Sequence, residues 1–309
     1  LRCWAIAQRP EPQYKNKWRA SDPGRVPEPN ERSSLKGCFC FIYLFCYNKS
    51  MKKIIKNRDN QNISIIIEET ADQKGLAFIM HGLGGFKEQP HLQAIAQACK
   101  DAGFTTIIFD TTNTLGKGES GGNYEDATVT NYYADLEDVI NWAEKQSWYQ
   151  EPFCLMGHSL GGICTALYAE NHPNKVKGLA PISTVISGKL SATTEKHVNI
   201  AEEWEKTGWR ITESISQPGI TKKLKWSHMT DRLKYDLLLQ VQKLTMPMLL
   251  IVGDQDNSTP IKHHEILYDK LPAKKEMHII KNGPHTFKDL EHLKEIKNIF
   301  DNWIAKEIL

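Results

Sequence analysis

From residue 62 onward, short apolar runs alternate with longer amphipathic stretches. The apolar runs predict seven strands, at residues 63–67, 77–80, 105–109, 153–156, 178–181, 248–252 and 277–280. The amphipathic stretches predict helices at residues 91–102, 129–146, 160–171, 261–271 and 290–304. Strands that are apolar almost throughout and are separated by helices are typical of a mostly parallel sheet with helices on both faces. The pattern therefore predicts an α/β fold.

One segment interrupts this alternation. Residues 183–244 separate two of the predicted strands and are rich in Lys, Glu and Trp. Because a structureless loop of that length is improbable in a compact domain, the segment is predicted to be a small helical insertion. Its helices are expected near residues 198–206 and 230–242, where they would form a cap over one edge of the sheet.

The first fifty residues differ in composition from the rest of the chain. Residues 1–50 contain five of the 14 prolines and four of the seven cysteines, without a sustained helical or strand period. They are followed by Met51-Lys52-Lys53, which resembles a translation start. We therefore expect residues 1–50 to be a disordered leader or upstream sequence outside the fold, and residues 51–309 to form the domain.

An apolar run at residues 38–47 is too short to cross a membrane, since a spanning helix needs about 20 residues. It could be the apolar part of a signal peptide, but no small-residue cleavage site follows it. Secretion is therefore the minor alternative to a cytoplasmic location. Cys99, Cys154 and Cys164 form an odd set in apolar surroundings, which is typical of buried thiols in a reducing compartment.

The charge balance argues against a nucleic-acid partner. The 309 residues carry a formal net charge of +2, and residues 1–50 hold nine Lys or Arg against four Asp or Glu. The remaining residues therefore carry a net charge of −3, without the basic excess that binding to phosphate backbones requires. A content of 40% hydrophobic and 25% charged residues excludes a fibrous or wholly disordered chain.

The most specific signal is Gly157-His158-Ser159-Leu160-Gly161-Gly162, between a predicted strand and a predicted helix. A serine hydroxyl becomes accessible as a nucleophile on a strained strand-to-helix turn, and Gly157 and Gly161 leave room for that turn. The following helix directs free N–H groups and its positive dipole end at the same point. A glycine-rich turn without function is the alternative, but the context favours Ser159 as a nucleophile.

A serine nucleophile needs a base and an orienting carboxylate, which in this arrangement follow as Asp and then His, each after a strand. Gly253-Asp254-Gln255-Asp256 and Asn282-Gly283-Pro284-His285 follow the last two predicted strands, where open α/β sheets place their ligands. Asp256 lies further out in its loop and is favoured as the acid, with Asp254 as the alternative. His285 is favoured as the base over four histidines predicted in helices or strands: His263, His264, His278 and His292.

Two backbone N–H groups are expected to stabilise the oxyanion of such a site. Leu160 N–H directly follows the nucleophile. The second donor is expected in the loop after the strand at residues 77–80, which reads His81-Gly82-Leu83-Gly84-Gly85. Because glycines let the backbone turn its amides inward, Leu83 is the predicted partner.

From about residue 63 to the end, the chain resembles the α/β-hydrolases. It is similar there to small-capped bacterial esterases of the feruloyl or cinnamoyl type and to acylglycerol lipases that are like serine aminopeptidases. The resemblance rests on the order and spacing of His81-Gly82-Leu83, Phe109-Asp110, Gly116-Lys117-Gly118-Glu119-Ser120 and the Ser159, Asp256 and His285 segments. It implies an eight-stranded sheet, a triad of Ser159, Asp256 and His285, oxyanion donors at Leu83 and Leu160, and a helical cap after the sixth strand.

The chain departs from these relatives in one loop. They read Asp-x-Arg-Gly-x-Gly-x-Ser after the fourth strand, whereas this chain reads Asp110-Thr111-Thr112-Asn113-Thr114-Leu115 before Gly116. The loop is longer and has no Arg. Whatever that Arg braces must therefore be held by another group.

These features predict a serine hydrolase that cleaves carboxylic esters of small acyl or aromatic acids through an acyl-enzyme, without a metal or organic cofactor. The expected partner is a small-molecule ester, with no nucleic acid and no stable membrane insertion. An aminopeptidase, a C–C bond hydrolase or a perhydrolase with the same triad is an alternative, as is a non-catalytic binding protein. An aminopeptidase would need an acidic group at the pocket, and Glu202, Glu203 and Glu205 are candidates, although a Glu-rich helix is usually a solvated face.

The apolar residues of the insertion have two interpretations. Trp204, Trp209, Ile211, Trp226 and Met229 could line an acyl or aryl pocket. They could equally form the inner face of the cap helices and pack on the sheet, which is the favoured interpretation. The insertion has no long hydrophobic lid, which favours a small acyl or aromatic ester over bulk lipid.

Overall fold

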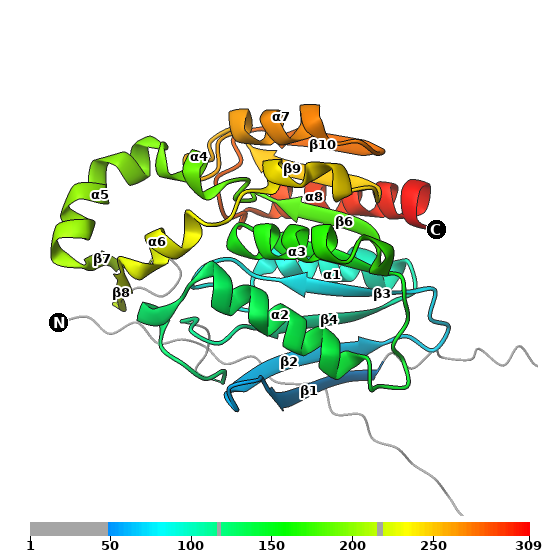
Figure 1. Ribbon diagram of the computed structural model, residues 1–309. Helices are drawn as coiled ribbons and strands as arrows, with labels where there is room; N and C mark the ends of the chain where they lie inside the picture. The colour runs from blue at the N-terminus through cyan, green and yellow to red at the C-terminus, as the bar shows by residue number, and fades with distance from the viewer. Residues whose placement is uncertain (1–48, 116–118, 215–218) are drawn as a thin grey trace, which may run out of the picture. The chain divides into compact units, whose positions relative to one another are not determined.

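The computed structural model describes residues 49–115, 119–214 and 219–309, and a central sheet of eight strands organises them. The strands follow the order β1-β2-β4-β3-β5-β6-β9-β10 (Figure 1). Their bounds are β1 (Lys49–Lys56), β2 (Asn62–Glu69), β3 (Gly75–Met80), β4 (Phe104–Asp110), β5 (Phe153–His158), β6 (Val176–Ile182), β9 (Met248–Gly253) and β10 (Lys275–Ile280).

The sheet is mostly parallel, as the sequence predicts. Strand β2 is antiparallel to both of its neighbours, β1 and β4, and every pair from β4 across to β10 is parallel. Strands β3, β4, β5 and β9 are buried at every position, which explains why they are apolar almost throughout. All seven predicted strands are present, and the implied total of eight is confirmed.

The strand that the sequence analysis missed is β1, at the edge of the sheet. Within residues 50–56 only Ile55 is buried, and the other positions are partly or fully exposed. Lys49 and Ser50, which the sequence pattern places in the leader, are the first two residues of this strand. Residues 1–48, including the apolar run at 38–47, lie outside the described residues.

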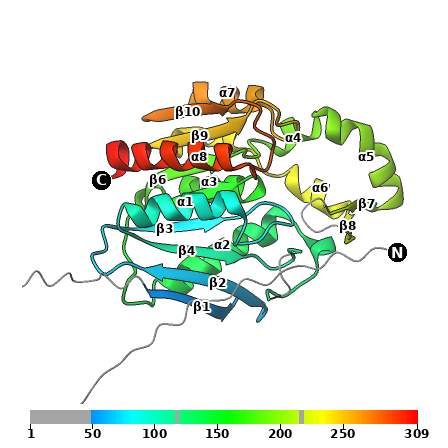
Figure 2. The same cartoon turned by 180° about the vertical axis from the view of Figure 1, so that it is seen from behind.

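Helices cover both faces of the sheet. On one face lie α1 (Pro90–Asp101) and α8 (Leu290–Trp303), in front in Figure 2. On the other lie α2 (Val129–Ala143), α3 (Leu160–Asn171) and α7 (Ile261–Lys270), in front in Figure 1. Each face has its own apolar core: Phe78 packs in one, and its neighbours Ala77 and Ile79 in the other, as the alternation along a strand requires.

Helix α2 shows how local sequence determines an element. The side chain of Thr128 accepts the N–H of Asn131 and caps the start of the helix. Apolar residues spaced three and four apart along the helix are buried: Tyr132, Leu136, Val139, Ile140 and Ala143. The helix ends at Ala143 rather than at residue 146. The other four predicted helices of the sheet's two faces are also present.

Cys99, Cys154 and Cys164 are buried with free thiols, as expected. Within the described ranges, no helix is both long and apolar enough to span a membrane.

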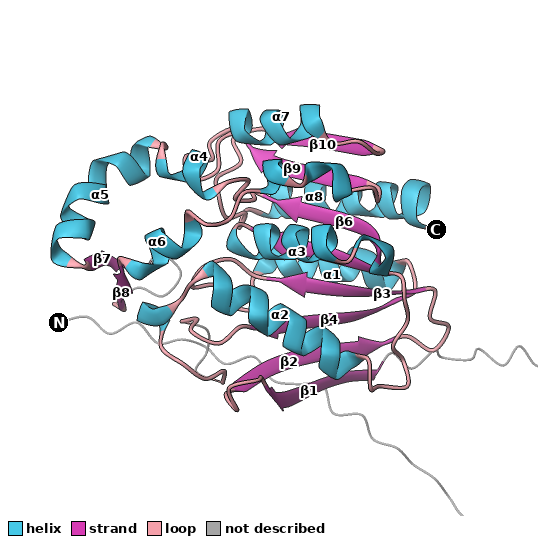
Figure 3. Cartoon of the chain, in the orientation of Figure 1, coloured by secondary structure: helices cyan, strands magenta, loops and turns pink. Residues whose placement is uncertain are grey.

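Residues 183–247, called the insertion below, connect β6 to β9 outside the main sheet. Figure 3 shows the described part of this segment, residues 183–214 and 219–247, as helices joined to a small hairpin beyond the carboxyl ends of the parallel strands. The elements are α4 (Gly188–Ala192), α5 (Glu195–Thr207), β7 (Trp209–Glu213), β8 (Thr221–Lys225) and α6 (Ser227–Arg232). Two short 3₁₀ turns follow, at Leu237–Leu239 and Val241–Lys243.

The helix predicted near residues 198–206 is present as part of α5, but the prediction of a helix at 230–242 was wrong. Helix α6 ends at Arg232, and Asp236 then adopts an extended conformation. Its carboxylate accepts hydrogen bonds from Leu238 N–H (2.9 Å) and from Ser187 Oγ (2.9 Å), which compete with a continuous helix. The insertion is also not purely helical, because β7 and β8 pair as an antiparallel hairpin.

A buried tryptophan should stabilise the packing of α8 on the sheet. Trp303 is 1% exposed, and a Cβ at Gly178 of β6 would lie 3.0 Å from its ring. We expect Trp303→Ala to lower the free energy of unfolding by about 3–5 kcal/mol. Leu290→Ala, at an 83% exposed position of the same helix, should change it by less than about 0.5 kcal/mol. Urea denaturation measures both, and equal losses would contradict this packing.

Candidate active site

Ser159 lies on the sharp turn between β5 and α3. Its φ of 55° and ψ of −112° are strained for a residue with a side chain. Ser159 N–H donates to Ile182 O (3.0 Å), and its own carbonyl accepts from Gly162 N–H (3.1 Å). The neighbouring strand β6 and the first turn of α3 thus hold the strained backbone in place.

The two glycines of the motif are required by close backbone contacts. A Cβ at Gly157 would collide with the carbonyl oxygen of Gly161, and a Cβ at Gly161 would collide with that of His81. No other residue fits without displacing backbone. The close packing of β5, α3 and the loop after β3 therefore explains why the turn needs glycine at both positions.

His285 and Asp256 meet Ser159 at the same edge of the sheet. His285 Nε2 lies 2.9 Å from Ser159 Oγ, and His285 Nδ1 lies 2.8 Å from Asp256 Oδ2. Asp254, the alternative acid, is exposed to solvent, and its N–H donates to Ile280 O. The structure thus brings together the three residues that the sequence favoured and leaves the alternative outside.

Asp256 is held as a buried, ionised carboxylate. Its Oδ1 accepts the N–H groups of Ser258 (2.8 Å) and Thr259 (2.9 Å), and its Oδ2 accepts Thr259 Oγ1–H (2.7 Å). Burial alone would raise the pKa of Asp256, but the hydrogen bonds and charge of His285, with the bonds from Thr259, hold it well below its usual range. An ionised carboxylate at this point can orient an imidazole and stabilise its positive charge.

His158, inside the motif, has a role that the sequence analysis missed. Its Nε2 donates to the main-chain carbonyl of His285 (2.7 Å), so one imidazole positions the backbone that carries the other. Burial, with the nearby His91 and His285, lowers the pKa of His158 well below its usual value. The ring is therefore neutral and acts as a hydrogen-bond donor rather than as a base.

The loop after β3 approaches Ser159 closely. A Cβ at Gly82 would lie 2.9 Å from Ser159 Cβ. The N–H groups of Gly84 and Gly85 donate to Tyr132 Oη and Gly82 O, whereas no described residue accepts from Leu83 N–H. Leu160 begins α3, where N–H groups have no intrahelical acceptor. Leu83 and Leu160 both line the cavity beside Ser159, so their amides are available to a ligand there.

A buried lysine braces the loop that lacks the expected Arg. The main-chain N–H and the Nζ of Lys87 each donate to Asp110 (both 2.6 Å), and Nζ also donates to Glu119 Oε2 (2.9 Å). Burial alone would lower the pKa of Lys87, but these bonds outweigh it and raise the pKa. Lys87 thus ties the loop after β3 to the loop after β4. Nothing in its local sequence distinguishes it from a surface lysine.

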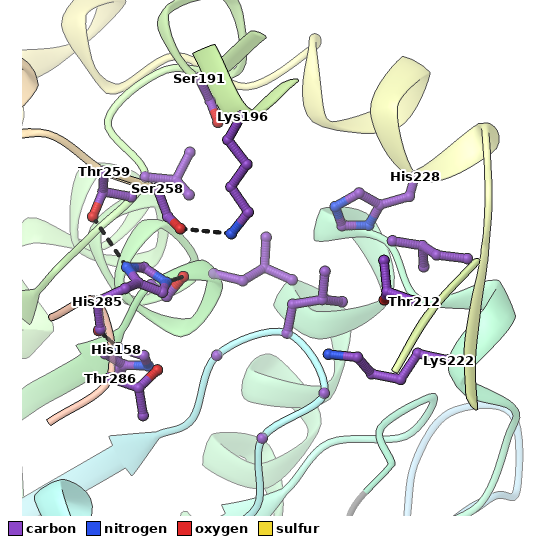
Figure 4. A pocket seen from close by; sticks show the side chains of 18 of the residues that line it. His158, Ser191, Lys196, Thr212, Lys222, His228, Ser258, Thr259, His285 and Thr286 are labelled. Carbon is purple, nitrogen blue, oxygen red and sulfur yellow. Dashed lines mark hydrogen bonds between the residues drawn. The ribbon is translucent and has the colours of Figure 1, made fainter. Parts of the chain in front are cut away.

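A cavity of about 480 Å³ opens beside Ser159 (Figure 4). One side consists of Ser159, His285 and the Gly82–Leu83 backbone; the other consists of side chains from the insertion. The five apolar residues that could have lined an acyl pocket are not among the lining residues. Trp204 and Met229 are buried in the core, whereas Trp209 and Ile211 are 37% and 61% exposed.

Among the described residues, no group of three or more His, Cys, Asp or Glu side chains is arranged to hold a metal ion. The chemistry that this arrangement can support is nucleophilic attack by Ser159 with proton transfer to His285.

Three features together define an α/β-hydrolase. They are a mostly parallel sheet with helices on both faces, a serine on the strand-to-helix turn after β5, and an Asp and a His after the last two strands of the sheet. The chain belongs to the serine aminopeptidase S33 family, whose sequence profile matches residues 71–289. It is therefore a hydrolase by family.

Its sequence relatives include enzymes that act on ester-type bonds. The chain is 25% identical over 215 residues to the mitochondrial palmitoyl-protein thioesterase ABHD10 of Bos taurus, a match that covers 69% of this chain and 67% of the relative. It is 21% identical over 206 residues to a thermostable monoacylglycerol lipase of Bacillus sp. strain H-257, which covers 65% of this chain and 80% of that relative.

Solved structures share the fold. Est1E from Butyrivibrio proteoclasticus with bound ferulic acid aligns with a TM-score of 0.69 and 21% identity over 83% of this chain and 99% of that chain. Mouse α/β-hydrolase domain-containing protein 10 aligns with a TM-score of 0.68 and 20% identity, again over 83% and 99%.

Two lysines that contact Glu119 allow a controlled test of the buried brace. We expect Lys87→Met to destabilise the protein by about 3–5 kcal/mol, because it leaves Asp110 as a buried carboxylate without its partner. Lys52→Met removes a half-exposed partner of the same Glu119 and should cost less than about 1 kcal/mol. Urea denaturation compares the two variants, and similar losses would show that Lys87 is not a structural brace.

Proposed function

We propose that the chain is a serine hydrolase that cleaves carboxylic esters of small acyl or aromatic acids through an acyl-enzyme. Ser159, His285 and Asp256 are its proposed catalytic residues. The proposal is carried by the two linked hydrogen bonds, 2.9 Å between Ser159 Oγ and His285 Nε2 and 2.8 Å between His285 Nδ1 and Asp256 Oδ2. The thioesterase and lipase names of the relatives support an ester-type bond as the target.

In the first half of the proposed reaction, Ser159 Oγ attacks the ester carbonyl carbon while its proton passes to His285 Nε2. Asp256 accepts the hydrogen bond of Nδ1–H and stabilises the imidazolium. The carbonyl oxygen becomes an oxyanion that accepts hydrogen bonds from Leu83 N–H and Leu160 N–H. The intermediate then expels the alcohol, which takes the proton from Nε2 and leaves an acyl group on Ser159.

In the second half, water attacks the acyl carbonyl and gives a proton to His285 Nε2. The same two amides stabilise the second oxyanion. Collapse of the intermediate releases the acid, and the proton returns to Ser159 Oγ, so that the enzyme is regenerated. The two halves of the proposed reaction use no group beyond these side chains, the two amides and water.

We further propose that the insertion acts as the cap that encloses the substrate. Its side chains form one side of the cavity that contains Ser159. The volume of about 480 Å³ is within the range of small-molecule pockets, which supports a small ester rather than a large polymer.

Two observations favour this function over an aminopeptidase and over a non-catalytic binding protein. An aminopeptidase needs an acidic group for the substrate's amine, but Glu202, Glu203 and Glu205 are solvent-exposed and do not line the cavity in the described residues. A non-catalytic binding protein would have no use for a buried, ionised Asp256 that contacts His285. A C–C bond hydrolase would use the same residues and is separated from an esterase by assay with a β-diketone substrate.

Replacing the nucleophile should abolish activity without unfolding the protein. We expect Ser159→Ala to lower kcat/KM for a short-chain 4-nitrophenyl ester by about a thousandfold or more. A fluorophosphonate probe should label Ser159 in the wild type and nothing in the variant. Ser183→Ala is the matched control, since Ser183 is also buried with positive φ (42°) but its hydroxyl has no partner among the described residues. Undiminished turnover in the Ser159 variant would refute the proposal.

The two aspartates of the loop after β9 offer a second test. We expect Asp256→Asn to lower kcat by about 10²–10⁴-fold, because an amide does not stabilise the imidazolium. Asp254→Asn, two residues earlier and exposed, should change kcat by less than about threefold. Ester-hydrolysis kinetics at saturating substrate distinguish them, and a reversed order would identify Asp254 as the acid.

A further inference from the structure

The side of the cavity that the insertion supplies is strongly basic. Lys196 of α5, Arg210 of β7, Lys222 of β8 and Arg232 of α6 all line it, and no Asp or Glu of the described residues does so. Figure 4 shows Lys196 and Lys222 directed into the cavity from different sides, with His285 to the left and His228 to the right. Four cations from four elements thus surround the space next to Ser159.

Within the described ranges, these four cations lack counter-ions. Among the residues that the structure describes, no carboxylate forms an ion pair with any of the four. Lys196 Nζ donates to the neutral Ser258 Oγ (2.7 Å), and Arg210 lies over the Trp204 ring at 5.7 Å from its centre. Arg232, only 6% exposed, contacts Met229 Sδ at 3.6 Å. For the buried Arg232, a charge removed from water without an opposite charge is destabilising on its own.

Several buried polar atoms at this wall also lack partners. They are Arg210 Nε, Arg232 Nε, His228 Nε2 and Ser191 Oγ, none of which has a hydrogen-bond partner among the described residues. All four residues line the cavity. Buried polar groups are nearly always paired in folded proteins, so a cluster of unpaired atoms at one wall indicates a ligand that pairs with them.

The mutual effects of the charges agree with this interpretation. Burial and the nearby charge of Arg210 lower the pKa of Arg232 to about 10. Burial, with the charges of Arg232 and Arg210, lowers the pKa of His228 to about 3. An anion in the cavity would relieve this repulsion, whereas the ammonium group of a peptide N-terminus would add to it.

We propose that the substrate is an ester with an anionic group, an inference that rests on the proposed function. Its anionic group is held by the cap residues Lys196, Arg210, Lys222 and Arg232 while its carbonyl lies at Ser159. A guanidinium group matches the planar geometry of a carboxylate and also binds phosphate, and two arginines face this cavity. These four residues are specificity residues, because they contact the substrate away from the bond that is cleaved.

Two matched substrate pairs test the charge preference on either side of the ester bond. Mono-(4-nitrophenyl) glutarate and its methyl ester differ in charge on the acyl side, and 4-acetoxybenzoate and its methyl ester differ on the alcohol side. At pH 7.5 we expect kcat/KM to be at least about tenfold higher for the charged member of at least one pair. The preference should shrink as salt is raised, since ions screen the attraction. An equal or higher kcat/KM for the neutral member of both pairs would overturn the inference.

Neighbouring lysines on β8 provide the matched variants. Lys222 lines the cavity, whereas Lys223 is exposed and does not. We expect Lys222→Met and Lys196→Met each to reduce the charged-to-neutral ratio of kcat/KM by about fivefold or more, and Lys223→Met to leave it at the wild-type value. Equal effects of the two β8 variants would show a general charge effect and contradict a specific subsite. Arg232→Met should reduce the ratio further, but the Lys222 and Lys196 variants decide the test even if this variant fails to fold.

The outcome also separates this inference from the proposed function. Cleavage of the neutral esters with labelling of Ser159, but without a charge preference, would refute the anionic subsite and leave the serine hydrolase intact. If none of the four esters is cleaved and Ser159 is not labelled, this result would contradict the proposed function, and the inference with it.

Discussion

The positive φ of Ser159 is the constraint on which the site depends. It holds the serine hydroxyl clear of the sheet, and it persists because three backbone segments meet there without side chains between them. Gly157 and Gly161 bring β5 and α3 within contact of each other and of the loop after β3. The same approach places Gly82 and Leu83 beside the serine, so one backbone arrangement positions both the proposed nucleophile and the amides proposed to serve it.

The proposed acid and base are positioned by a second backbone contact, between the loops after β9 and β10. Gln255 N–H donates to Gly283 O (3.0 Å), and a Cβ at Gly253 would collide with that carbonyl. Since β9 and β10 are adjacent and parallel, their carboxyl ends bring Asp256 and His285 together although 29 positions separate them. His158 then links His285 back to the turn that carries Ser159, which makes the three segments one unit.

Two buried cations, Lys87 and Arg232, have different electrostatic surroundings. Lys87 is paired with Asp110 and Glu119 and links two loops, so its charge contributes to the structure. Arg232 is nearly as buried and faces the cavity, but among the described residues no carboxylate forms an ion pair with it. The residues from 51 onward carry a negative net charge, yet the cavity wall is basic. Net charge therefore describes the whole chain and says little about the potential inside one pocket.

The sequence by itself determined the alternation of strands and helices and predicted Ser159, Asp256 and His285 as the catalytic residues, because each lies in a local signal directly after an apolar run. It missed β1, whose lysine-rich edge hides the strand pattern, and it placed a helix at residues 230–242, where Asp236 bonds the backbone instead. Only the tertiary structure decided the roles of Lys87, His158 and the basic wall. Lys196, Arg210, Lys222 and Arg232 come from four separate elements and resemble solvated surface residues in the sequence. Their shared environment exists only in the folded chain, because burial and electrostatic repulsion depend on distances through space, which local sequence patterns do not specify.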